Sequence, residues 1–357
     1  MQPVNHDTLN LSDGRLIVPS GYSPYLNLRK TEEAIQFIKD RFQRELAAAL
    51  NLSRVSSPLF VVSNTGVNDH LNGIEKPVSF GIKDIGETAE IVQSLAKWKR
   101  LALSDYEFAT GEGLYTDMNA IRPDEALDNL HSIYVDQWDW ERIVDKSERS
   151  VEFLKTIVRK IYGVIRDTER EVCRHYPELP APFLPDEIEF IHTEELEELY
   201  PALTPKERET AVCKEKKAVF IIGIGANLKS GEPHDGRASD YDDWSTEGEN
   251  GRKGLNGDIF AWYHPLQCAF EFSSMGIRVN AESLMNQLEI RNELFKKELY
   301  FHRRLLENQL PLTIGGGLGQ SRLCMFFLRK AHIGEVHASI WSDEMISECK
   351  KYKIPLL

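Results

Sequence analysis

Hydrophobic residues recur at helical spacing in two long stretches of the chain. Residues 31–50 carry apolar side chains at steps of three or four, behind an acidic first turn, which predicts an amphipathic helix. Residues 147–176 repeat this spacing until Pro177 ends it, which predicts a second long helix. A third helix is predicted from Thr204 towards Lys217, because Thr204-Pro-Lys-Glu207 combines a capping residue, a proline and a reciprocal glutamate.

Short apolar runs predict strands at residues 59–62, 218–223, 258–263 and 269–279. Between the first strand and the next helix, residues 63–72 are rich in Asn and Gly and read as a loop. Strands occur in adjacent pairs as well as singly, which favours a mixed, largely antiparallel sheet over a strict βαβ repeat. The sequence therefore predicts an α+β fold.

The C-terminal third continues this alternation. We expect one helix over residues 282–307, a glycine-rich turn over residues 313–319 and an apolar helix over residues 321–328. Because no linker or repeat interrupts the chain, residues 25–357 are expected to form a single catalytic domain. Residues 1–24 are expected to be a poorly ordered extension.

Composition narrows the function. The 43 Lys and Arg residues against 56 Asp and Glu residues give a formal charge of −13, which disfavours a nucleic-acid partner. Five scattered cysteines argue against a disulfide framework or a zinc site. Neither a targeting peptide nor an apolar run of membrane-spanning length is apparent. These features predict a cytoplasmic enzyme that acts on small molecules without binding a membrane.

Two glycine runs in the sequence differ from the known nucleotide-binding motifs. The run from Gly223 has Leu228 where a dinucleotide fingerprint needs its third glycine, and the run from Gly315 fails at Gln320. Close packing is the better interpretation of the first run. The second run favours a ligand role, because its glycines would let a helix approach a ligand and direct Arg322 at it.

Charged residues cluster in two further segments. Arg122 and Glu125 lie before His131 and a predicted strand, a hairpin suited to hold a phosphate and a cation, although a surface ion pair is the common interpretation of this pattern. Asp258 and Glu271 on adjacent strands offer oxygen ligands for a hard cation. The acidic segment 240–243 is by default a solvated turn, or else it grips a substrate ammonium group.

These segments together resemble a known family. The helix and strand separated at Pro58, the Arg122-x-x-Glu125 hairpin and Gly315-Gly-Gly-Leu-Gly-Gln-Ser-Arg322 resemble the three ordered motifs of class II aminoacyl-tRNA synthetases. Within that superfamily, the chain resembles the ammonia-dependent asparagine synthetases. The runs that carry this closer resemblance are Ser94–Arg100, Gly111–Thr116, Val135–Glu141, Asp240–Thr246, Leu255–Asp258 and Ser273–Arg278.

The resemblance implies a fold, an assembly and a reaction. The fold would be a class II synthetase-like antiparallel sheet flanked by helices, and the assembly a homodimer built around the first helix and strand. The reaction would join L-aspartate and ammonia at the expense of ATP through a β-aspartyl-adenylate, giving L-asparagine, AMP and diphosphate. Alternatives are an aspartyl- or asparaginyl-tRNA synthetase-like enzyme, or a catalytically inactive paralogue.

The resemblance also implies roles at the nucleotide. Because the first step joins two anions, fixed cations are needed in advance. Arg122 would bridge the aspartate carboxylate and the α-phosphate, and Arg322 would contact adenine or the terminal phosphates. ATP-binding roles also fall to four further residues: Glu125, His131, Gly317 and Gly319. Asp258 and Glu271 would hold Mg²⁺.

Roles at the amino acid follow in the same way. By resemblance, Asp139 and Asp242 would hold the α-ammonium group of aspartate. Its α-carboxylate would fall to Ser274 and Arg278, and its reacting side chain to Lys99 and Gln137. Because the second step needs free ammonia, a carboxylate near the anhydride would attract ammonium and remove a proton. Asp69, on the Asn- and Gly-rich loop, is the candidate.

Overall fold

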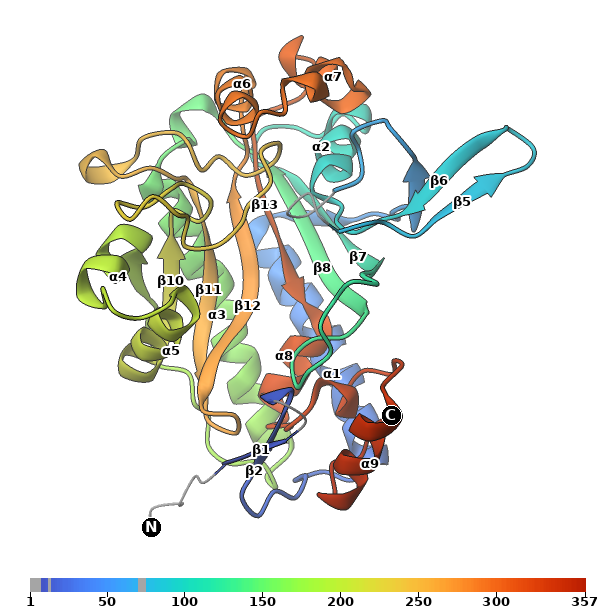
Figure 1. Ribbon diagram of the computed structural model, residues 1–357, viewed down its shortest axis with the longest axis vertical. Helices are drawn as coiled ribbons and strands as arrows, with labels where there is room; N and C mark the ends of the chain where they lie inside the picture. Colours follow the sequence, from blue (N-terminus) through green and yellow to red (C-terminus); the bar gives the residue numbers. More distant parts are fainter. Residues whose placement is uncertain (1–7, 12–13, 70–74) are drawn as a thin grey trace.

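The computed structural model describes residues 8–11, 14–69 and 75–357 (Figure 1). Its centre is an eight-stranded sheet in the order β3-β7-β8-β13-β12-β11-β10-β9. These strands are β3 Leu52–Arg54, β7 Gly113–Ile121, β8 Tyr134–Ile143, β13 Thr313–Gly319, β12 Cys268–Ile277, β11 Asn256–Tyr263, β10 Ala218–Ile222 and β9 Glu189–His192. The inner pairs are antiparallel, and the edge strands β3 and β9 run parallel to their neighbours. The α+β class and the largely antiparallel sheet are confirmed.

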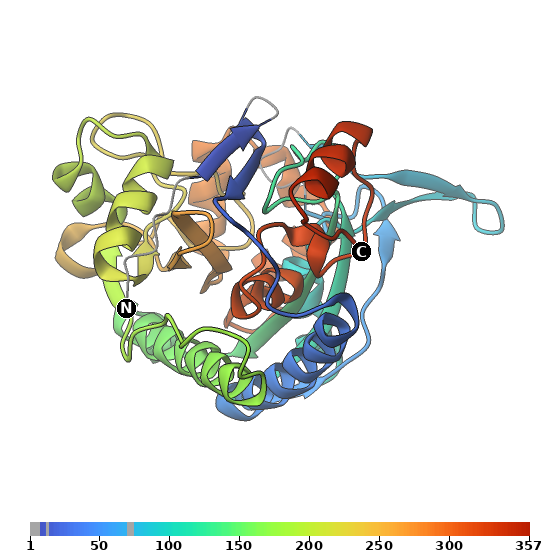
Figure 2. The same ribbon diagram turned by 90° about the horizontal axis from the view of Figure 1, so that it is seen from below.

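Two long helices cover one face of this sheet. Helices α1 (Leu28–Leu50) and α3 (Val151–His175) lie side by side in Figure 2 and pack against each other. The apolar stripe predicted for α1 is buried, and Phe42 stacks on Trp138 of β8 at 4.7 Å between ring centroids. Trp140 is buried as well. Because alternate residues of a strand point to opposite faces, Gln137, Asp139 and Glu141 point away from these helices.

The remaining helices are shorter. They are α2 Ala96–Asp105, α4 Thr193–Leu199, α5 Pro205–Lys216, α6 Ala281–Ile290, α7 Tyr300–Leu306, α8 Gln320–Phe327 and α9 Asp343–Lys351, with 3₁₀ turns at η2 Lys146–Glu148, η3 Glu249–Gly251, η4 Leu294–Glu298 and η5 Ile333–Glu335. The predicted start of α5 is confirmed, since Thr204 and Glu207 cap each other's backbone. Among the described residues, no helix is both long enough and apolar enough to cross a bilayer.

Two predictions for the C-terminal third are wrong. The single helix expected over residues 282–307 is divided into α6, η4 and α7, and Asn292 takes a left-handed φ of 55° just after α6. The glycine-rich turn expected over residues 313–319 is β13, which lies in the middle of the sheet. Glycines weaken strands in general, so the pattern favoured a turn. Their position here is explained by the side chains that crowd β13.

The N-terminal extension also differs from its prediction. Strands β1 (Thr8–Leu11) and β2 (Leu16–Pro19) form an antiparallel hairpin, and Leu16 and Val18 are buried in the main core. The hydroxyl of Tyr22 donates to Glu335, close to the other end of the chain. The expectation of a poorly ordered extension is therefore wrong for residues 8–11 and 14–24. The rest of that segment lies outside the described residues.

A second, three-stranded sheet projects from the body of the molecule (Figure 1). It is formed by β4 (Phe60–Val62), β6 (Glu87–Ile91) and β5 (Ser79–Ile82), and β6 lies between the other two. The strand predicted at residues 59–62 is confirmed, but its apolar side chains are largely exposed. Phe60 and Phe80 are 47% and 40% exposed and contact each other edge to face.

Candidate active site

Two adjoining cavities, of about 210 and 320 Å³, form one cleft over the face of the sheet opposite α1 and α3. Six residues line both cavities: Arg122, Glu125, Gln137, Glu271, Ser274 and Gly317. The smaller cavity also contains Arg322 and His131, whereas the larger contains Asp69, Lys99, Asp139, Asp242 and Arg278. The cleft therefore brings together every candidate site residue except Asp258, which lines neither cavity.

Arg278 anchors the larger cavity. Its Nη2 lies 2.8 Å from Glu141 Oε2, and its Nη1 pairs with Asp242 Oδ1. Burial alone would lower the pKa of Arg278, but the two carboxylates outweigh burial and raise that pKa. Burial in turn would raise the pKa of Glu141, which Arg278 holds below its usual range. Both groups are therefore charged, and further N–H groups of the guanidinium remain for a substrate carboxylate.

Lys99 enters the same cavity from α2. Its Nζ donates to the carbonyls of Trp140 at 3.0 Å and Gly316 at 3.1 Å, and lies 3.5 Å from Asp139 Oδ2. The side chain is 1% exposed, and burial lowers its pKa. An ammonium group fixed by main-chain oxygens is a preorganised positive charge for an anionic reactant.

The glycines of β13 leave room for these side chains. A Cβ atom built on Gly315 would lie 1.9 Å from Glu141 Oε2, and one on Gly317 would lie 2.4 Å from Gln137 Oε1. These separations are far below van der Waals contact. A strand with any larger residue at these positions would displace the polar side chains of β8, so the glycine run is a requirement of the cleft.

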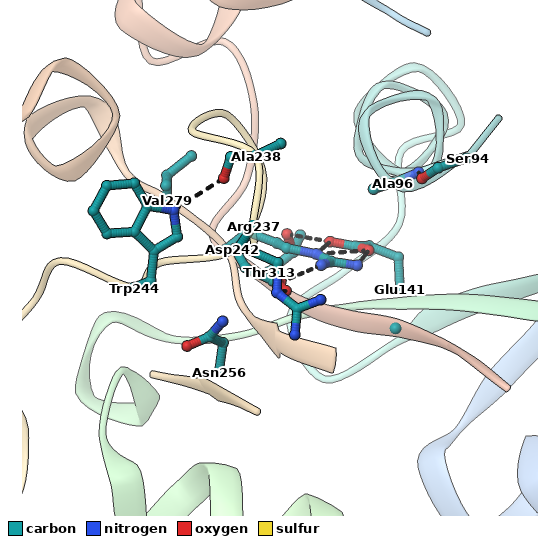
Figure 3. A network of polar contacts seen from close by, with 12 residues as sticks. Ser94, Ala96, Glu141, Arg237, Ala238, Asp242, Trp244, Asn256, Val279 and Thr313 are labelled. Atoms are coloured by element: carbon teal, nitrogen blue, oxygen red, sulfur yellow. Dashed lines mark hydrogen bonds and ion pairs between the residues drawn. The ribbon is translucent and has the colours of Figure 1, made fainter. Parts of the chain in front are cut away.

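Arg237, Asp242 and Glu141 belong to one network of polar contacts beside the larger cavity (Figure 3). Arg237 Nη2 lies 2.6 Å from Asp258 Oδ1, and Arg237 Nε lies 3.4 Å from Asp242 Oδ2. Burial, with Glu271 adding to it, raises the pKa of Asp258 to about 7 despite the arginine. Asp258 thus sits behind the cleft wall, paired with Arg237, whereas Glu271 lines the cleft and lies 3.3 Å from Arg322 Nη1.

The carboxylates of Asp258 and Glu271 are too few to bind a hard cation alone, so substrate oxygens would have to complete the site. Within residues 8–11, 14–69 and 75–357, no group of three or more His, Cys, Asp or Glu side chains is arranged to hold a metal. Mg²⁺ commonly takes one or two carboxylates and completes its shell with phosphate oxygens and water. Glu271, which lines the cleft, fits that requirement, whereas Asp258 is paired with Arg237 and lines neither cavity.

Two arginines line the smaller cavity. Arg122 follows β7 and donates from Nη2 to the carbonyl of Gln93 at 3.3 Å, whereas Arg322 projects from α8. His131 lines the same cavity, with Nδ1 2.9 Å from Asp128. Two arginines that are two hundred positions apart in sequence thus face one cavity. Such a pair can hold a polyanion between them.

Asp69 also lines the larger cavity. Its carboxyl-bearing side chain is buried, and its main-chain N–H donates to Asn68 Oδ1 at 3.0 Å. Burial first, and then Asp69, raise the pKa of Tyr241, another residue of this cavity. The cavity therefore contains the carboxyl group of Asp69 as well as its cationic residues. The last part of the predicted loop, from residue 70, lies outside the described residues.

The motifs in the sequence did not reveal Arg237 and Asp235, which line the larger cavity, and Tyr241 appeared only as a member of the acidic segment 240–243. They lie in the segment between β10 and β11, which is long for a connection in a compact domain. Loops of that length are commonly functional, and this length was the available signal.

Comparisons with known proteins agree with this geometry. A family model described as aspartate-ammonia ligase matches residues 29–353. An aspartate–ammonia ligase of Ruminiclostridium cellulolyticum is 60% identical over 343 residues, which are 96% of this chain and 99% of that protein. One from Parabacteroides distasonis is 59% identical over 94% of this chain and 97% of that protein.

Solved structures show the same fold at low sequence identity. Asparaginyl-tRNA synthetase from Pyrococcus horikoshii, complexed with asparaginyl-adenylate, has a TM-score of 0.65 and 16% identity over 91% of this chain and 75% of that one. Aspartyl-tRNA synthetase from Entamoeba histolytica has a TM-score of 0.59 and 12% identity over 86% and 58% of the two chains. The class II synthetase-like fold is thus confirmed. With the family match, the chain belongs to the aspartate–ammonia ligase family and is a C–N bond-forming ligase for ammonia-dependent asparagine synthesis.

Proposed function

We propose that this ligase activates aspartate with ATP as a β-aspartyl-adenylate before ammonia attacks. A side-chain oxygen of aspartate attacks the α-phosphorus and diphosphate leaves; ammonia then attacks the acyl carbon and AMP leaves. The supporting observation is that Arg122 lines both halves of the cleft, between the arginine-lined and the lysine-lined ends. A fixed cation at that junction lowers the cost of bringing two anions together.

The nucleotide occupies the smaller cavity in this proposal. Arg322 contacts adenine or the terminal phosphates, and Glu125 and His131 line the same space. Gly317 and Gly319 keep the end of β13 free of side chains, so that the nucleotide can approach the strand. Asp258 and Glu271 would hold Mg²⁺, which would neutralise phosphate charge.

Aspartate occupies the larger cavity. Asp139 and Asp242 hold its α-ammonium group, while Arg278 and Ser274 hold its α-carboxylate. Lys99 and Gln137 then face the reacting carboxylate, which lies towards Arg122. All six residues line this cavity, which supports the assignment, because both ends of a small zwitterion must be recognised to select it.

We assign Asp69 to the second step, as the group that attracts ammonium and takes its proton. Asp69→Asn is therefore expected to lower asparagine formation and raise the KM for ammonium. The same variant is expected to retain aspartate-dependent ATP–diphosphate exchange, which reports the first step alone. An equal loss in both assays would contradict this role.

The reaction is tested by asparagine and AMP release from aspartate, ATP and ammonium chloride without tRNA. Product under these conditions excludes an aspartyl- or asparaginyl-tRNA synthetase-like enzyme and an inactive paralogue. Aspartate-dependent exchange without asparagine release on addition of ammonium would contradict the proposed reaction. A matched reaction with glutamine in place of ammonium tests whether the donor is ammonia itself.

The proposed assembly is a homodimer in the cytoplasm. The strand predicted to take part in the interface lies in the three-stranded sheet, where Leu59, Phe60, Val62 and Phe80 are 38–49% exposed. Apolar side chains gathered on one exposed sheet are typical of an interface. All five cysteines of the described chain are free, which suits a reducing compartment.

A further inference from the structure

A third cavity lies next to the catalytic cleft and has no part in the proposed chemistry. It has a volume of about 420 Å³ and lies between the loop after β4, strand β6, helix α2 and the segment η4–α7. Its charged side chains are Glu90, Lys97, Asp240, Glu293, Lys296 and His302. This cavity is called the rear cavity below.

Two buried side chains that line the rear cavity have an unused hydrogen-bonding atom. Asp240 Oδ2 accepts from Lys97 Nζ at 2.9 Å and lies 3.0 Å from His302 Nε2. Asp240 Oδ1 and His302 Nδ1 have no hydrogen-bond partner among the described residues, although both side chains are about 1% exposed. Because a carboxylate oxygen only accepts hydrogen bonds, Asp240 Oδ1 requires a donor that the described residues do not supply.

The charges of the rear cavity favour a cation as that donor. Lys97 neutralises Asp240, and Lys296 lies 2.8 Å from Glu293. Glu90 accepts a hydrogen bond from the neutral amide of Asn68, so its charge is not cancelled by that partner. Apart from His302, the cavity contains three carboxylates and two lysines, whose formal charges sum to −1. One small monovalent cation with N–H groups would compensate that charge and donate to Asp240 Oδ1.

In three segments of the chain, two residues adjacent in sequence line the rear cavity and the catalytic cleft respectively. Asn68 lines the rear cavity and Asp69 the cleft; Lys97 and Ala96 are divided in the same way. In the third segment, Asp240 lines the rear cavity and Tyr241 lines the cleft. The rear cavity and the cleft are therefore adjacent along these three segments.

We propose that the rear cavity is a binding site for the ammonium ion, which supplies the nitrogen substrate to the cleft through the wall that carries Asp69. The proposal rests on the ammonia-dependent reaction and adds a separate place of entry for ammonium. Aspartate and ATP would then fill the front of the cleft without blocking the third substrate. The site would also raise the local concentration of ammonium beside the residue assigned to deprotonate it.

Two substitutions test the site by kinetics. Glu90→Gln removes one negative charge from the cavity and keeps the shape of the side chain, while His302→Gln keeps a donor for Asp240 and removes the ring nitrogen Nδ1. Each is expected to raise the KM for ammonium about tenfold, the usual effect of one lost charge-assisted hydrogen bond. Aspartate-dependent ATP–diphosphate exchange without ammonium is expected to stay at the wild-type rate, which separates this proposal from the adenylation chemistry.

The matched control is Glu87→Gln, an exposed carboxylate on the same strand as Glu90, which is expected to leave the KM for ammonium unchanged. An unchanged KM in both test variants would overturn the proposal. A loss of diphosphate exchange in Glu90→Gln would also overturn it, because the residue would then act in the first step.

A direct measurement uses thallous ion, a heavy monovalent cation of ammonium-like size. Crystals of the wild-type protein in thallous acetate are expected to show an anomalous peak in the rear cavity beside Asp240 Oδ1. Ammonium acetate is expected to displace that peak, and tetramethylammonium acetate, which has no N–H group, is expected to leave it. A rear cavity without a peak, or with a peak that ammonium leaves in place, would contradict the proposal.

Discussion

At the scale of single residues, the proposed first step of the reaction depends most on Arg122. It is the cation among the six residues shared by the two halves of the cleft, and its guanidinium is held by a hydrogen bond to the carbonyl of Gln93. A neutral carbonyl positions the guanidinium without cancelling its charge. This differs from Arg278, which has two carboxylate partners and is better suited to recognition of a whole amino acid.

We predict that Arg122→Ala lowers kcat/KM for aspartate-dependent ATP–diphosphate exchange by about 10²- to 10³-fold, the usual loss for a fixed group that stabilises a transition state. Arg122→Lys should recover part of this loss, since it restores the charge but not the planar fork. The control is Arg54→Ala, which removes an exposed arginine paired with Asp117. Equal exchange rates in Arg122→Ala and wild type would contradict the role.

The sequence predicted the residues that belong to short motifs. Arg122, Glu271, Arg278 and Arg322 each lie in a short motif, and the expectation that they meet came from the resemblance to class II synthetases, not from local pattern. Arg237 could not be found in this way. Its role depends on how an irregular loop crosses over β11 to reach Asp258, and no periodicity encodes that crossing.

At the scale of elements, β13 shows how a strand can be selected for small volume. Its glycines contribute backbone hydrogen bonds to β8 and β12 while leaving space for Gln137 and Glu141. Local propensity predicted a turn over residues 313–319 because it reflects only the cost of glycine in a strand. It contains no information about side chains on neighbouring strands. Helices α1 and α3 were predicted correctly because the helical spacing of their apolar residues can be read from the local sequence alone.

We predict that Gly317→Ala leaves the fold intact but lowers asparagine synthesis at least tenfold, because the new methyl group would displace Gln137 and Asp139 in the cleft. The measurements are the KM for aspartate, which should rise, and the thermal unfolding midpoint. Gly163→Ala is the control: no atom lies within 4 Å of its added methyl group, and it should stabilise α3 by about 0.5–1 kcal/mol. A Gly317→Ala enzyme with wild-type kinetics would contradict the packing argument.

The short turn η5 contains a pH-sensitive cap. His332 Nδ1 accepts from the N–H of Gly334 at 3.0 Å, and its ring lies against Trp341. Burial lowers the pKa of His332 to about 4, compared with 6.5 for the unperturbed group. Between those values the unfolded chain binds a proton that the folded chain does not, so stability falls as the pH falls from 6.5 to 4.

We predict that His332→Asn reduces this pH dependence. Asparagine keeps an acceptor near Nδ1 but does not titrate, so about 3 kcal/mol of the loss in unfolding free energy between pH 6.5 and pH 4 should disappear. Urea denaturation of both proteins at several pH values measures the difference. Parallel curves for the two proteins would show that His332 is protonated while folded.

At the scale of the whole molecule, the projecting three-stranded sheet gives the chain an apolar surface that its own core does not cover. Phe60 and Phe80 form an edge-to-face pair there, and Ile85 at the adjoining turn is 60% exposed. A net charge of −13 would keep single molecules apart, so association needs such a localised apolar area.

We predict that the wild-type protein sediments as a homodimer and that the double substitution Phe60→Asp with Phe80→Asp yields a monomer. Burying two carboxylates in an apolar contact costs several kcal/mol, more than a moderate dimer interface can offset. The control is Ile340→Asp, an equally drastic change at a residue that is 73% exposed on another part of the molecule. A dimer that persists in the double variant would place the interface elsewhere.

The place of β13 in the sheet has a consequence for biosynthesis. Strands β3, β7 and β8 form one side of the large sheet and β9 to β12 the other, and β13, the last strand in sequence, joins them. Until β13 has been synthesised, the two groups therefore remain unconnected, and the inner edges of β8 and β12 lack partners. The large sheet can close only once β13 is available, and until then the two unpaired edges are open to aggregation.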